Sequence, residues 1–384
     1  MWRTVVVMAA AAIALGLAWL GPAEALDYLK FRRDNKEHQV AGRVLVTAQD
    51  GGLMILARDG ELWTVQPNER PVLTRDAVRF QPFSADELAQ KLLAGLPEGF
   101  EVHRTAHYVI LYGTTREYAQ WCGALFERLY ANFTNCWSKK GFALSEPEFP
   151  LVAIVFGDRQ SYLRHAEPEA GEAAKSIKGY FNLMTNRMTM YDLSEGGASA
   201  RGRGRGRTAA QINQILSQPE AAWNVATIVH EATHQIAFNC GLHTRFSDCP
   251  RWFSEGIAMY FETPDLASAK GWSSIGRVNR PRLAQFQAYL KKRPPDSLVN
   301  LLTNDKQFLD AQKGADAYAE AWVLTYFLIH RYPKQCVAYL RTLSAKKPLI
   351  QDDAATRLEE FKQAFGDDLA KLDQEMLRFL AKIR

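Results

Sequence analysis

Short apolar runs separated by turn signals occupy residues 38–66 and predict β structure there. The pairs Gly51-Gly52 and Asp59-Gly60 are the turn signals. The expected strands are 40–46, 53–56 and 61–65. We therefore expect a small N-terminal β module over residues 26–80.

A different pattern follows, in which isolated strands alternate with helical stretches. Ser84–Leu93 is an expected amphipathic helix, with Ser84 as N-cap and Glu87 completing a capping box. Further elements are strands at 108–112, 151–156 and 188–191, and a helix at 115–137. From Ala221 onward the spacing of 3.6 predicts helices at 221–238, 250–262, 280–292, 316–331, 334–344 and 353–382, the last broken at Gly366. The expected class is α+β, with a mixed sheet and a helical C-terminal part.

The first 25 residues predict a secretory signal peptide. Arg3 precedes an apolar run from Val5 to Leu20, and an Ala-x-Ala sequence ends at Ala25. An uncleaved membrane anchor is the alternative, but the run is shorter than the roughly 20 residues that span a bilayer. We expect a secreted or periplasmic protein with no stable membrane insertion after cleavage.

Composition excludes some classes of protein. The chain has 384 residues, of which 47% are hydrophobic and 23% charged, so global disorder is not expected. A net charge of +5 does not by itself imply nucleic acid as a partner. The alternating Arg-Gly tract at 201–207 predicts a solvated loop, with contact to an acidic polymer as the weaker alternative.

The expected export predicts that some of the five cysteines form disulfides, because thiols pair in oxidising compartments. Cys240 and Cys249 enclose a short loop, and Cys122 and Cys136 are a second candidate pair. Cys336 would remain unpaired. Buried free cysteines are the alternative for all five.

The chemistry centres on the segment His230-Glu231-Ala232-Thr233-His234. On a helix, positions i and i+4 share one face, so both imidazoles can bind one metal ion. Glu231 lies beside the first histidine, where its carboxylate would reach a metal-bound water. Two surface histidines on an ordinary helix are the alternative interpretation.

A catalytic zinc site needs a third protein ligand. The downstream candidates are His243, Asp248, Glu255 and Glu262. A histidine six residues after His234 would indicate a metzincin, but that position is Cys240, so a metzincin is excluded.

The segment Trp252-x-x-Glu255-Gly256-x-Ala258, together with the histidine motif, resembles the gluzincin clan of zinc peptidases. The resemblance covers roughly residues 101–345 and is greatest to the small peptidase domains of that clan. It implies a zincin-like domain, with Zn²⁺ as cofactor and Glu255 as the third ligand. Gly256 would let its helix pack closely on the histidine helix. The expected divisions are the signal peptide 1–25, the β module 26–80, the peptidase domain 84–345 and a helical extension 346–384.

The aminopeptidase branch of the clan has a tyrosine on a later helix that stabilises the reaction intermediate. By resemblance Tyr318 is the candidate here, with Tyr326 and Tyr260 as fallbacks. That branch also carries a glutamate for the substrate's free amine, which this chain lacks, so an endopeptidase is the better expectation. The strand at 188–191 could pair with an extended peptide.

We thus expect zinc-dependent hydrolysis of a protein or peptide substrate, with Glu231 as general base. One alternative is a zinc hydrolase acting on another carbonyl substrate. The other is a catalytically inactive or non-peptidase zinc-binding protein of the cell envelope with a binding role.

Overall fold

The computed structural model describes residues 25–194, 208–263 and 275–383. The Arg-Gly tract and all of the predicted signal peptide except Ala25 lie outside these ranges. The chain divides into two units, one containing residues up to 58 and 63–81, the other containing 59–62 and 82–384. Within the described residues, no helix is both long and apolar enough to cross a bilayer.

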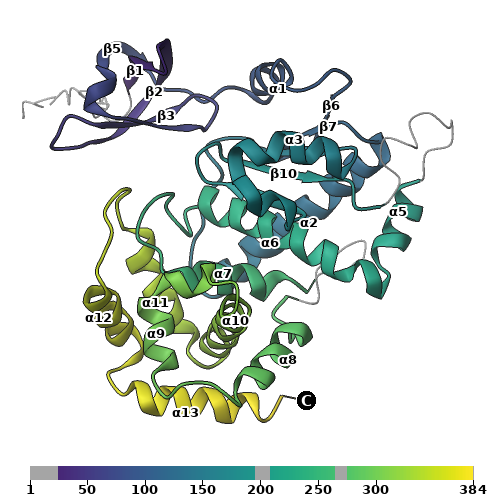
Figure 1. Ribbon diagram of the computed structural model, residues 1–384, viewed down its shortest axis with the longest axis vertical. Coiled ribbons are helices and arrows are strands. Elements are labelled where there is room, and N and C mark those ends of the chain that lie inside the picture. Colours follow the sequence, from purple (N-terminus) through teal and green to yellow (C-terminus); the bar gives the residue numbers. More distant parts are fainter. Residues whose placement is uncertain (1–24, 195–207, 264–274, 384) are drawn as a thin grey trace, which may run out of the picture. The chain divides into compact units, whose positions relative to one another are not determined.

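The smaller unit contains a five-stranded sheet (Figure 1). Its strands lie in the order β4-β3-β2-β1-β5. They are β1 (Ala25–Arg33), β2 (Lys36–Thr47), β3 (Leu53–Ala57), β4 (Leu62–Val65) and β5 (Val72–Arg79). β1 and β2 form an antiparallel hairpin whose turn residues, Asp34 and Asn35, both have a positive φ.

The sequence predicted the β2, β3 and β4 regions but missed β1 and β5. In β1 the buried Leu29 and Phe31 are separated by a charged residue, and the buried Leu26 is followed by the buried Asp27, so the strand has no continuous apolar run. Every residue of β5 is exposed, so this strand has no apolar face to reveal it.

The larger unit has a mixed sheet in the order β6-β7-β8-β10-β9. Its strands are β6 (Glu101–Arg104), β7 (Tyr108–Tyr112), β8 (Leu151–Phe156), β9 (Gly179–Asn182) and β10 (Arg187–Tyr191). The central strands β7, β8 and β10 are parallel, whereas β6 and β9 pair antiparallel to their neighbours. The strand predicted at 188–191 is therefore an interior strand with partners on both sides, so the prediction that it could pair with a peptide was wrong. β9 is an edge strand of the described sheet.

Helices surround this sheet and form the C-terminal part (Figure 1). They are α1 (Ala85–Leu93), α2 (Arg116–Lys139), α3 (Arg159–Ala170), α5 (Ala209–Leu216), α6 (Pro219–Asn239), α7 (Arg251–Phe261), α8 (Arg280–Tyr289), α9 (Ser297–Thr303), α10 (Gly314–Arg331), α11 (Pro333–Ser344), α12 (Ala354–Phe365) and α13 (Leu369–Leu380). The architecture is thus mixed α+β, with an N-terminal β region and a helical C-terminus. Helices α3, α5 and α9 were not predicted; α3 buries only Tyr162 and Ala166 and has no apolar stripe.

The expected disulfides are absent, because all five cysteines are free. Cys122 and Cys136 lie on the same helix, α2, where a separation of 14 residues corresponds to roughly 21 Å. That distance is far beyond the reach of a disulfide bond. Cys122, Cys240 and Cys336 are buried in the apolar core, which agrees with the alternative of buried free thiols.

Gly256 packs against a different helix from the one expected. A Cβ atom at this position would lie 2.8 Å from the Ala321 carbonyl oxygen and closer still to the Thr325 hydroxyl, both on α10. The close approach of α7 is therefore to α10 and not to the histidine helix α6.

Replacing Gly256 with alanine is expected to destabilise the fold by about 1–3 kcal/mol, because the added methyl group overpacks the α7–α10 contact. Urea unfolding of the metal-free protein measures the change. Gly95→Ala is the matched control, since its new Cβ would meet only the Leu92 carbonyl oxygen at 3.6 Å. Equal stability of the two variants would contradict this prediction.

Candidate metal centre

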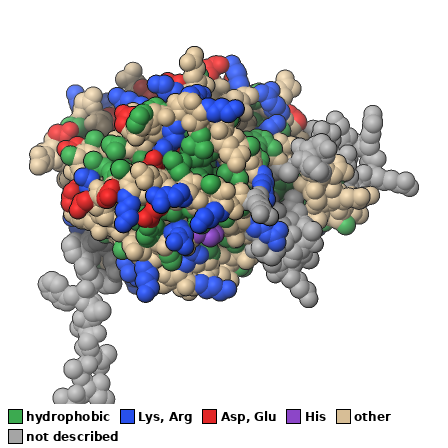
Figure 2. All heavy atoms as spheres, turned by 90° about the horizontal axis from the view of Figure 1, so that it is seen from below, with side chains coloured by type: hydrophobic (Ala, Val, Ile, Leu, Met, Phe, Trp, Pro, Cys, Tyr) green, Lys and Arg blue, Asp and Glu red, His purple; other side chains and the backbone are tan. Residues whose placement is uncertain are grey.

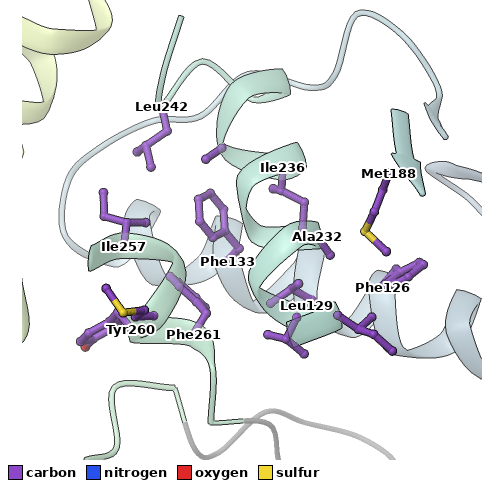
Figure 3. Packing of buried hydrophobic residues seen from close by; sticks show 14 of the residues in the cluster. Phe126, Leu129, Phe133, Met188, Ala232, Ile236, Leu242, Ile257, Tyr260 and Phe261 are labelled. Atoms are coloured by element: carbon purple, nitrogen blue, oxygen red, sulfur yellow. The ribbon is translucent and has the colours of Figure 1, made fainter. Parts of the chain in front are cut away.

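The histidine helix α6 is fixed by its apolar face. Ala232 and Ile236 are fully buried and lie next to Phe126, Leu129 and Phe133 of α2 (Figure 3). These contacts hold one face of α6 in the core. His230, Glu231 and His234 are left to line a cavity beside it.

Three of the predicted residues converge, namely His230, His234 and Glu255. Their ligand atoms all lie within 4.8 Å of one another. His230 Nε2 is 3.1 Å from Glu255 Oε2 and 3.1 Å from His234 Nε2. His234 Nε2 is 3.5 Å from the same Glu255 oxygen.

These separations fit a bound metal ion. Two ligands at tetrahedral angles and zinc distances of 2.0–2.1 Å lie about 3.3–3.4 Å apart. The three observed separations of 3.1, 3.1 and 3.5 Å bracket that value. Two imidazoles and one carboxylate are also a donor set that zinc accepts. The group could therefore hold a metal ion with little rearrangement.

The other ring nitrogen of His230 is also held. Its Nδ1 donates a hydrogen bond of 2.8 Å to Glu262 Oε1, at the end of α7. Glu262 in turn accepts from Asn279 at 2.8 Å and pairs with Arg282 at 3.3 Å. A carboxylate on the second nitrogen fixes the orientation of a metal-binding imidazole. Glu262, one of the sequence candidates for the third ligand, thus orients a ligand instead.

These contacts shift the pKa values of the group. Burial lowers the pKa of His230, but hydrogen bonds to Glu255 and Glu262 outweigh it and raise the pKa to about 10. Burial raises the pKa of Glu262, and His230 with Arg282 more than reverses this, to about 2. In the metal-free protein at neutral pH, His230 therefore carries a proton that a metal ion must displace.

Glu262→Gln is expected to weaken metal binding by about 10- to 100-fold, because the amide is a poorer acceptor for His230 Nδ1. Competition with a fluorescent zinc chelator measures the affinity. Glu359→Gln, on the exposed face of α12, should leave it unchanged. Unaltered affinity in Glu262→Gln would contradict the orienting role.

Glu231 lines the same cavity but does not join the three ligands. Its Oε2 accepts a hydrogen bond of 2.8 Å from the Phe181 backbone N–H of the edge strand β9. Burial raises the pKa of this carboxyl group, while the neighbouring His230 and His234 oppose the rise. A carboxylate whose pKa is raised, and which lies beside residues that could hold a metal ion, is suited to taking up a proton.

Tyr318 reaches the cavity from α10. Its hydroxyl lies 3.4 Å from Nη2 of Arg251, the first residue of α7. The fallback residues Tyr260 and Tyr326 are buried and contact each other with ring centroids 6.3 Å apart. Among the tyrosines of the described ranges, Tyr318 is the one that lines the cavity.

The cavity has a volume of about 560 Å³ and is lined partly by apolar and partly by polar side chains. Its apolar lining is Phe181, Leu183, Phe238 and Phe246. Its polar lining, apart from the ligands and Glu231, includes Ser247, Arg251, Ser254, Asp305, Tyr318 and Gln351. A smaller hollow of about 180 Å³ also borders His230 and Tyr318 and is lined by Trp223 and Arg282.

Two sequence candidates for the third ligand lie in other contacts. Asp248 is held by Arg357 at 2.5 Å and Lys346 at 3.4 Å. His243 is buried, and its Nδ1 lies 3.6 Å from Cys249 Sγ. Neither belongs to the metal-binding group found within the described residues.

Sequence reasoning missed Arg251 and the Phe181 amide. Arg251 could have been noticed, because it lies one helical turn before Glu255 and so on the same face of α7. The Phe181 amide had no signal, since a backbone group carries none in the sequence.

The comparisons assign no activity. Residues 224–350 match the model of a family described as a protein of unknown function, DUF1570. No curated protein matches the chain. The matched segment contains His230, Glu231, His234, Glu255 and Tyr318.

Proposed function

We propose that this protein is a zinc-dependent peptide hydrolase of the gluzincin type, built on a zincin-like fold. The observation that carries the proposal is the spacing of the donor atoms of His230, His234 and Glu255, with Glu231 beside them but not among them. Zinc-assisted hydrolysis requires protein ligands for the metal and a separate carboxylate that can act as general base. The three converging residues and Glu231 would meet these two requirements.

Each side chain then has a defined task. His230, His234 and Glu255 would hold a zinc ion, which would serve as a Lewis acid that acidifies water and polarises a carbonyl. Glu231 takes a proton from the attacking water and later delivers it to the leaving amine. Tyr318 donates a hydrogen bond to the oxyanion of the tetrahedral intermediate.

The edge strand supports an extended peptide as substrate. β9 has a strand partner only on its β10 side within the described sheet, and its Phe181 amide already points at Glu231. A peptide added along this edge would bring a carbonyl group past the general base. With the predicted export, we propose an endopeptidase acting outside the cytoplasm.

Digestion of an unfolded protein by the purified enzyme tests this function. We expect cleavage that a chelator abolishes and added zinc restores, with about one zinc ion per chain by metal analysis. Bound zinc without cleavage would favour the envelope-binding alternative, or a zinc hydrolase of another carbonyl substrate. Absence of bound metal would overturn the proposal.

A further inference from the structure

Arg251 is the feature of the cavity that the proposed hydrolysis does not use. Among the described residues it is the only Lys or Arg that lines the larger hollow. Its Nε is buried without a hydrogen-bond partner, and Nη2 has only the long 3.4 Å contact to the Tyr318 hydroxyl. About a third of the side chain, 35%, remains exposed. A guanidinium group has five N–H donors, and the one side-chain hydrogen bond that the described residues show for Arg251 is this long contact.

The acidic groups near Arg251 leave its guanidinium without a bidentate partner. Glu255 directs Oε2 at the two histidines, and its Oε1 is 3.5 Å from Arg251 Nε, too far for a hydrogen bond. Asp305 accepts the Arg251 backbone N–H at 2.9 Å and pairs with Arg357 at 2.8 Å. Glu231 accepts from the Phe181 amide. None of the three forms the bidentate pair that a guanidinium favours.

We propose that Arg251 binds a carboxylate of the substrate beside the metal centre. That the bound molecule is a substrate rests on the proposed function. The preference for a carboxylate can be measured by binding alone. A free C-terminus and an acidic side chain both present this group. Phe181, Leu183, Phe238 and Phe246 line the same cavity, so the substrate would combine a carboxylate with an apolar side chain.

The position of Arg251 determines where a bound carboxylate would lie relative to the metal centre. Its guanidinium lies between the ligand Glu255 and the Tyr318 hydroxyl, at 3.5 and 3.4 Å. A carboxylate held there would be next to the reacting group and would fix the substrate's register in the cavity. A C-terminal carboxylate would place cleavage near the end of a chain, while an acidic side chain is compatible with cleavage at an internal bond.

Fluorescence anisotropy on zinc-loaded Glu231→Gln protein tests the preference without turnover. The probes are N-terminally labelled hexapeptides of one apolar sequence: one with a free C-terminus, one amidated, and amidated forms with a single Glu at each position. Gln at the same positions provides the uncharged references. We expect one carboxylate form to bind about 10-fold or more tightly than its reference, as expected of a charge-assisted hydrogen bond. Which form it is identifies the source of the carboxylate.

Substitution of Arg251 assigns the preference to this residue. Arg251→Met should remove the preference, and Arg251→Lys should keep part of it. Arg378→Met, an exposed change on α13, is the matched control for loss of one positive charge and should keep all of it. Equal binding of all probes to protein with Arg251 intact would overturn the inference, whether or not the Arg251 variants fold. A preference that survives in folded Arg251→Met would also overturn it.

The two proposals fail separately. Chelator-sensitive digestion without any carboxylate preference would leave the hydrolase proposal intact and remove this one. An Arg251-dependent preference in a protein that cleaves nothing would retain the carboxylate site and remove the hydrolase.

Discussion

Glu231→Gln is expected to lower the rate of peptide hydrolysis by about 10²- to 10⁴-fold while leaving one zinc ion bound per chain. Glutamine has nearly the same shape as glutamate and can still accept the Phe181 N–H through its amide oxygen. It has no carboxylate to take the proton from water. The loss should therefore appear in kcat, with the metal site undisturbed.

The measurement pairs steady-state cleavage with metal analysis on the same preparation. Thermal unfolding curves show that the variant remains folded. Cleavage by Glu231→Gln at the wild-type rate would contradict the assignment of the general base. Loss of zinc in this variant would instead indicate that Glu231 belongs to the ligand group.

Glu255→Ala is expected to lose metal and activity together. It removes one of the three residues that could hold a metal ion among the described residues, and even residues that merely orient ligands account for 10- to 100-fold in affinity. We therefore expect zinc affinity to fall by more than about 100-fold. The carboxylate that contacts His230 Nε2 also disappears, leaving Glu262 as the one carboxylate at that imidazole.

Zinc titration against a chelating indicator measures this loss. Glu359→Ala, which removes an exposed carboxylate on α12, serves as the control and should bind zinc normally. Wild-type affinity in Glu255→Ala would show that a different residue is the third ligand. Asp248 and Glu262 would then need to be tested in the same way.

The sequence predicted the elements that have a clear periodic pattern. The helix pair carrying His230 and Glu255 was predicted within two residues at each end, because its apolar spacing is strong. The capping box of Ser84 and Glu87 is confirmed by both of its hydrogen bonds. Elements that bury few side chains, such as α3 and β5, were missed for the converse reason.

The site itself was only partly predictable. Motif spacing paired His230 with His234, and the resemblance to the gluzincin clan added Glu255; the structure brings the three together. Motif spacing could not assign Glu262 to His230 Nδ1, because that contact depends on how α6 and α7 cross. The prediction of disulfides was wrong because compartment and sequence spacing do not reveal that Cys122 and Cys136 lie far apart on α2 or that other cysteines are buried in the core.

Charge patterning adds little to this picture. On the face drawn in Figure 2, basic and acidic side chains lie interspersed with apolar ones. In the proposed carboxylate site, the anionic group would meet a single guanidinium inside a cavity. Binding of such a group should be far less sensitive to salt than binding to an exposed basic surface.

The lack of a side chain at Gly256 limits which substitutions relatives of this protein can carry at that position. Gly256 follows the ligand Glu255 directly, and the helix it touches carries Tyr318 one turn before Ala321. The α7–α10 spacing therefore sets the distance between a ligand and the proposed oxyanion donor. Among relatives, an alanine or serine at position 256 should be rare, because a smaller residue at position 325 would relieve the contact with Thr325 but not the one with the Ala321 carbonyl oxygen. A glycine at position 256 throughout the relatives would indicate that they keep the same spacing between α7 and α10.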